Sequence, residues 1–144
     1  MRRERRDFLV VITDSSDPSI EPERRVLGAV GAEVRRFQCR TEEDVVRVGA
    51  EADGLLVEFA KITKRVIDGL NRVKVISRYG VGVDNVDVRA ATRRGIYVAN
   101  TPYDLENVAD HSVMLILALA RKLPRALWMT RQGRWEWNSL RPLP

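Results

Sequence analysis

Residues 74–87 hold the stretch of this sequence that is best suited to binding a ligand. The segment reads K-V-I-S-R-Y-G-V-G-V-D-N-V-D, with Gly80 and Gly82 directly after an apolar, β-branched run. Two glycines one residue apart let the backbone turn sharply and come close to a bound molecule. Arg78 places a guanidinium beside them, which could pair with a carboxylate. From the residues alone, an anion-binding loop and a tight turn without a ligand fit this pattern equally well.

A helix is expected directly after this glycine loop. Asp84 fits an N-cap, and Asp87 three residues later takes the place of Glu or Gln in a capping box. The spacing predicts a helix over Asn85–Arg94 that ends at a C′ glycine, Gly95. Free N–H groups and the positive end of its dipole would then face the anion.

Few other side chains combine into a chemical site. His111 is the only histidine and has no acidic partner nearby, so it is a weak candidate for acid–base work. Cys39 is the only cysteine and has no metal-ligating neighbours. Glu58 and Lys61 follow a predicted strand and are interpreted as solvated charges beside a crevice. We therefore predict no catalytic residue and no metal site.

Length and composition fit one cytoplasmic domain with a real core. The chain has 144 residues, and its single cysteine suits a reducing compartment. No signal peptide precedes the run Phe8–Ile12, and no apolar run approaches the ~20 residues of a membrane span. The net charge of +5 comes from scattered arginines, including Arg2–Arg6, without an aromatic-interleaved basic stripe. Membrane insertion and nucleic-acid binding are disfavoured.

Predicted strands and helices alternate along the first hundred residues. This alternation indicates right-handed βαβ units, and therefore a parallel sheet with helices on both faces. The strands are expected at Phe8–Thr13, Glu33–Phe37, Asp53–Phe59, Val73–Ser77 and Ile96–Ala99, and the first three helices at Pro22–Gly31, Glu42–Ala50 (opened by Thr41 and Asp44) and Thr63–Leu70.

The pattern changes after Pro102. Tyr103–Glu106 is interpreted as a link, and Asn107 with Asp110 as the N-cap pair of a long helix, Val108–Leu123. This helix is apolar on almost every side, so we expect a second copy to bury it in a homodimer. The tail with Trp135 and Trp137 is interpreted as the start of a further domain that has been cut off.

The sequence resembles the N-terminal part of the D-isomer-specific 2-hydroxyacid dehydrogenases. The resemblance covers residues 53–137 and includes S-R-Y-G-V-G-V-D-N, A-A-T-R-R-G-I-Y-V-A-N-T-P, V-A-D-H-S and G-R-W-E-W. It is most similar to the branch that contains the C-terminal-binding proteins and phosphoglycerate-dehydrogenase-like enzymes. The resemblance implies hydride transfer between NAD or NADP and a small 2-hydroxy or 2-oxo acid.

The resemblance also implies how the chain is divided into domains. Residues 1–102 would form a flavodoxin-like substrate-binding domain with strand order 2-1-3-4-5, and residues 103–144 would begin a truncated nucleotide domain. Backbone around Tyr79, Gly80, Val81 and Gly82 would hold the substrate carboxylate. Arg78, beside this loop, is either a surface or inter-domain charge or a further contact of that carboxylate. The position of Val81 would also lie near the nicotinamide of the cofactor.

Two departures from the family pattern limit what this chain is expected to do. The phosphate fingerprint G-x-G-x-x-G and the later catalytic arginine, glutamate and histidine are absent, so the chain alone should be inactive and bind no cofactor tightly. Glu58-Phe59-Ala60 stands where phosphoglycerate-type members tend to carry a basic residue, which disfavours a phosphorylated substrate. The alternative is a non-catalytic regulatory or assembly module that dimerises through the helix at residues 108–123.

Overall fold

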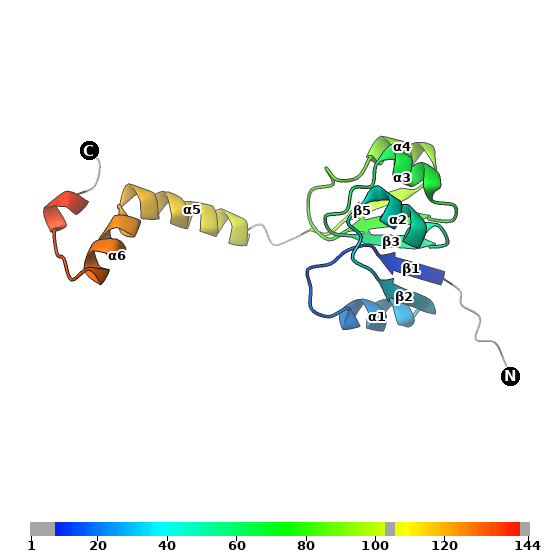
Figure 1. Ribbon diagram of the computed structural model, residues 1–144, viewed down its shortest axis with the longest axis horizontal. Helices are drawn as coiled ribbons and strands as arrows, with labels where there is room; N and C mark the ends of the chain where they lie inside the picture. Colours follow the sequence, from blue (N-terminus) through cyan, green and yellow to red (C-terminus); the bar gives the residue numbers. More distant parts are fainter. Residues whose placement is uncertain (1–7, 103–105, 142–144) are drawn as a thin grey trace. The chain divides into compact units, whose positions relative to one another are not determined.

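Five parallel strands form the centre of the first part of the chain, in the order β2-β1-β3-β4-β5 (Figure 1). This is the flavodoxin-like order expected from the resemblance, so the predicted fold class is confirmed. The strands are β1 (Phe8–Ile12), β2 (Ala32–Arg36), β3 (Gly54–Val57), β4 (Val75–Arg78) and β5 (Tyr97–Asn100).

The computed structural model describes residues 8–102 and 106–141. The basic run Arg2–Arg6 and most of the predicted link at Tyr103–Glu106 lie outside the described residues. The chain divides into two compact units, Met1–Tyr103 and Asp104–Pro144.

One face of the sheet carries the hydrophobic core of the first unit. Its register pairs Val11 with Leu55, Leu55 with Ile76 and Ile76 with Val98. In parallel pairing these partners point to the same face of the sheet. Each aliphatic side chain buried there contributes ~1.5–3 kcal/mol to the free energy of folding. Helices α2 (Glu42–Gly49), α3 (Lys64–Gly69) and α4 (Val88–Arg93) lie on one side of the sheet and α1 (Glu21–Gly28) on the other (Figure 1).

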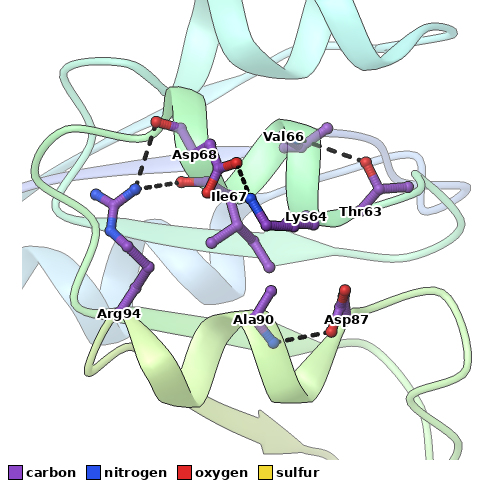
Figure 2. A network of polar contacts seen from close by, with 8 residues as sticks. All are labelled: Thr63, Lys64, Val66, Ile67, Asp68, Asp87, Ala90 and Arg94. Atoms are coloured by element: carbon purple, nitrogen blue, oxygen red, sulfur yellow. Dashed lines mark hydrogen bonds and ion pairs between the residues drawn. The ribbon is translucent and has the colours of Figure 1, made fainter.

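Side-chain caps fix where the core helices begin. The predicted capping box of α2 is present, with Thr41 accepting from the Asp44 N–H and Asp44 accepting from the Thr41 N–H. At α3 only the N-cap bond is present, with the Thr63 side chain accepting from the Val66 N–H. Figure 2 shows how Arg94, at the end of α4, donates to carbonyls at the end of α3, including that of Ile67 at 3.0 Å. These contacts hold α3 and α4 side by side beneath the loops that follow β3 and β4.

The helix expected directly after the glycine loop begins later than predicted. α4 starts at Val88, and its N-cap is Asp87, which accepts from the Ala90 N–H at 2.8 Å, so the prediction of Asp84 as N-cap is wrong (Figure 2). Val86 forms a parallel bridge with Ile62, and the Asn85 amide donates to carbonyls of the preceding loop. These tertiary contacts prevent an earlier helical turn. The C′ position of Gly95 is confirmed by its φ of 67°.

The second unit contains α5 (Glu106–Ala120), α6 (Leu123–Arg131) and a 3₁₀ turn, η1 (Trp137–Leu140). The long helix predicted over Val108–Leu123 therefore ends earlier than predicted, at Ala120. The chain turns at Lys122, whose φ is 53°, and Pro124 lies in the first turn of α6. α5 begins before Asn107, so the predicted Asn107–Asp110 cap pair lies inside the helix. Within the described residues, neither helix is long and apolar enough to cross a membrane.

Candidate functional site

The glycine loop after β4 is held at the carboxyl edge of the sheet by the end of β5. The Asn100 amide donates to the Val81 carbonyl at 2.8 Å, and the Thr101 N–H donates to the Gly80 carbonyl at 3.1 Å. The Thr101 hydroxyl adds a bond to the Arg78 carbonyl at 3.1 Å. The carbonyls of the loop are thus bound from one side, which fixes the direction of its N–H groups.

Several N–H groups of this loop have no acceptor. The N–H of Tyr79 donates to the Val57 carbonyl. Within the described residues, those of Val81, Gly82 and Val83 donate to no protein oxygen. Successive free backbone N–H groups in a turn form a concave site suited to an anion. The site uses the loop itself and not a helix N-terminus, because α4 begins only at Val88.

The Arg78 guanidinium lies directly over Gly80. A Cβ atom placed on Gly80 would stand 1.5 Å from Nη1 of Arg78, and the φ of Gly80 is 139°. A side chain at position 80 would be strained at this φ and would displace the guanidinium from its place over the loop. Within the described residues the guanidinium has no hydrogen-bond acceptor, and its Nε is buried. A partly buried cation without a partner would gain from a bound carboxylate.

Tyr79 turns away from this site. Its hydroxyl donates to Oε1 of Glu23 on α1 at 3.0 Å. Burial, together with the hydrogen bond and charge of Glu23, raises the pKa of Tyr79. Adjacent residues of an extended strand point to opposite faces, so Arg78 and Tyr79 cannot both line the same crevice with their side chains. Only the backbone of Tyr79 belongs to the loop that forms the site.

The neighbouring loop after β3 is fixed by Asp14, which the sequence reasoning did not identify. Asp14 is only 6% exposed, and its carboxylate accepts the N–H groups of Glu58 (3.2 Å), Phe59 (2.6 Å) and Ala60 (3.1 Å). From the other side, the Asn85 amide donates to the carbonyls of Glu58 and Ala60. An acid directly after a central strand, at the edge where ligands bind in such sheets, was the signal in the sequence.

The two loops enclose a small crevice of about 200 Å³. It brings together two of the predicted site residues, Arg78 and Gly82, and its full lining is Glu58, Phe59, Arg78, Gly82, Asp84 and Asn85. Val81 is exposed at the rim of the loop. This crevice is the candidate site, because it is lined by Arg78 and by Gly82, one of the three loop residues with a free N–H group.

The other residues considered in the sequence lie elsewhere. Cys39 and Lys61 line a cleft beside α2 that shares Phe59 with the candidate crevice. Burial raises the pKa of the Cys39 thiol to about 11, which keeps it unreactive at neutral pH. His111 lies on α5 in the second unit. Among the described residues, no three His, Cys, Asp or Glu side chains gather closely enough to hold a metal ion.

Comparison with known proteins gives one consistent match. The family model "D-isomer specific 2-hydroxyacid dehydrogenase, catalytic domain" matches residues 10–137. D-3-phosphoglycerate dehydrogenase of Sus scrofa is 39% identical over 129 residues, which are 88% of this chain and 24% of that protein. The chain thus spans about a quarter of the length of the curated relatives it matches.

Solved structures agree with the sequence match. The NADPH-dependent glyoxylate/hydroxypyruvate reductase from Sinorhizobium meliloti, in complex with citrate, is 30% identical with a TM-score of 0.74; the match covers 94% of this chain and 42% of that one. The NAD⁺-bound 3-phosphoglycerate dehydrogenase of Entamoeba histolytica is also 30% identical, with a TM-score of 0.70 over 80% of this chain and 40% of that one.

Proposed function

Because the chain belongs to the D-isomer-specific 2-hydroxyacid dehydrogenase family, we propose that its first unit is the substrate-binding domain of such an enzyme. The second unit would be the beginning of its nucleotide-binding domain. The family consists of oxidoreductases, and this chain corresponds to only part of its matched relatives. In the longer protein, a hydride would pass between NAD or NADP and C2 of a small 2-hydroxy or 2-oxo acid.

The free N–H groups of the glycine loop beneath the Arg78 guanidinium carry this proposal. A substrate carboxylate would accept hydrogen bonds from the N–H groups of Val81 and Gly82 and pair with Arg78. Bound in this way, the carboxylate would fix the position of C2 beside the exposed residue Val81, where the nicotinamide is expected. Orienting the reacting carbon is the part of catalysis that this unit can supply.

The relatives' names favour more than one substrate and cofactor. They include 3-phosphoglycerate dehydrogenases, one of them bound to NAD⁺, and a glyoxylate/hydroxypyruvate reductase that depends on NADPH. We propose the shared chemistry for this chain, a 2-hydroxy or 2-oxo acid with a nicotinamide cofactor. The proposed compartment is the cytoplasm, since the single free cysteine suits a reducing environment.

A homodimer is proposed through α5, and it is also the basis of the alternative function as an assembly module. Apolar side chains are exposed along the helix at Val113, Met114, Leu115, Ile116, Leu117 and Leu119. A patch of this kind is normally covered by another protein surface, and two-fold pairing of identical chains is the commonest arrangement. A monomer at micromolar concentration with α5 ordered would contradict this proposal.

The carboxylate site can be tested with pyruvate and its neutral analogue pyruvamide. Saturation-transfer NMR should detect millimolar binding of pyruvate to the purified chain, and pyruvamide should bind at least tenfold more weakly because it has no carboxylate to accept the loop N–H groups. Equal binding of the two compounds, or no binding of pyruvate, would reject the proposed site.

A further inference from the structure

Glu58 holds a fixed carboxylate in the wall of the candidate crevice. Its two side-chain oxygens accept from the Ser16 N–H at 2.5 Å and from the Ser16 hydroxyl at 2.6 Å. Its own N–H donates to Asp14, and its carbonyl accepts from Asn85. Side chain and backbone are therefore both held in place. The Glu58 carboxylate therefore has a defined place in the crevice wall.

The charges around the crevice are unequal. Asp84 brings a second carboxylate, since its Oδ2 would lie 3.2 Å from a Cβ placed on Gly82. Against these two acids, Arg78 is the one cation among the lining residues. A substrate carboxylate bound to the loop would use this guanidinium. A second anionic group on the same substrate would then find no cation in the lining and two carboxylates within the same small volume.

Resting on the proposed function, we propose that Glu58 determines substrate specificity by excluding acids that carry a phosphate or a second carboxylate. The site accepts 2-hydroxy and 2-oxo monocarboxylates whose remaining part is uncharged. Phe59, which lines the crevice beside Glu58 and is 70% exposed, offers an apolar surface for that part of the substrate. Repulsion between a second anionic group and the two carboxylates of the lining acts against such acids and leaves uncharged groups unaffected, which is the basis of the discrimination.

The test compares D-glycerate with 3-phospho-D-glycerate, two acids that share the same carboxylate and C2 hydroxyl. Binding of each is measured by NMR to the wild-type chain, Glu58→Gln and Glu58→Arg. Glu51→Gln is the matched control, because it removes one exposed acid outside the crevice lining. Amide spectra of every variant establish that the sheet is intact before affinities are compared.

The expected result is at least tenfold weaker binding of the phosphorylated acid to the wild-type chain. The ratio of the two dissociation constants, 3-phospho-D-glycerate over D-glycerate, should fall severalfold in Glu58→Gln. Glu58→Arg should bind the phosphorylated acid more tightly than D-glycerate, and Glu51→Gln should keep the wild-type ratio. Equal binding of both acids to the wild-type chain, or a ratio unaffected by either Glu58 variant, would overturn the inference while leaving the carboxylate site standing. Failure of both D-glycerate and pyruvate to bind would reject the proposed function, and the inference with it.

Discussion

The Tyr79 hydroxyl donates a hydrogen bond to Oε1 of Glu23 at 3.0 Å and so joins the end of β4 to α1. This bond explains why Tyr79 contributes only its backbone to the candidate site. Tyr79→Phe should lower the free energy of unfolding by ~1 kcal/mol, the usual loss for one hydrogen bond, without changing the affinity for pyruvate. The matched control is Tyr97→Phe, which alters a tyrosine that is 79% exposed. Urea denaturation and a pyruvate titration provide the two measurements.

Burial of Tyr79, together with this hydrogen bond, predicts a pH effect. The pKa of Tyr79 is raised in the folded protein, so the folded state holds its proton at a pH where the unfolded chain, with a pKa near 10, releases it. Protonated Tyr79 therefore makes its full contribution to stability below about pH 10, and this contribution is lost as pH rises above that value. Between pH 9 and pH 11, the free energy of unfolding should fall more steeply with pH for the wild-type chain than for Tyr79→Phe. Parallel curves would contradict the assignment.

Asp14 should be the residue on which the β3 loop depends most. Asp14→Ala removes the acceptor of three partly buried backbone N–H groups, and we expect a loss of ~2–3 kcal/mol in unfolding free energy. Pyruvate affinity should also fall, because Glu58, Phe59 and Asn85 would no longer be fixed around the crevice. Asp17→Ala changes an exposed acid nearby and should have little effect on either measurement.

Gly80 should tolerate no side chain. Gly80→Ala would place a methyl group against the Arg78 guanidinium at a φ of 139°, so we expect lower stability and loss of pyruvate binding. Gly28→Ala is the matched control, because nothing lies within 4 Å of the added Cβ at that helical position. It should be neutral or stabilise the protein by up to ~1 kcal/mol. Unchanged pyruvate binding by Gly80→Ala would mean that the guanidinium over the loop is not needed.

The expectation that this chain binds no cofactor tightly can be tested by its own fluorescence. All three tryptophans, Trp128, Trp135 and Trp137, lie in the second unit and are exposed. Titration with NADH should show no saturable quenching up to millimolar concentration. Saturable binding in the micromolar range would mean that the second unit builds a nucleotide site without the G-x-G-x-x-G fingerprint.

Local patterns predicted the elements of the fold well, and tertiary contacts account for the differences. The capping box of Thr41 and Asp44 depends only on spacing, and it is present as predicted. The start of α4 was misplaced because Asn85 is held by carbonyls that precede it by more than twenty residues. Such a contact has no signature in the local sequence.

The site was predicted only in part, for a similar reason. The glycine loop is a local motif and was identified from the sequence. The roles of Asp14 and Ser16 depend on contacts with the loop after β3, 42 or more residues further along the chain. The opposite directions of Arg78 and Tyr79 follow from strand geometry, and the partner of Tyr79 on α1 became visible only in the fold.

The most direct test of the proposed carboxylate site is to map pyruvate binding on the ¹⁵N-labelled chain, residue by residue. The largest saturable shifts should fall on the amides of Val81, Gly82 and Val83, with smaller shifts at Glu58 and Phe59. The amides of Leu9 and Lys74, which donate to Asp53 near the opposite edge of the sheet, should not move. Shifts centred on any other part of the chain, with the glycine loop unaffected, would contradict the proposal that this loop holds the substrate.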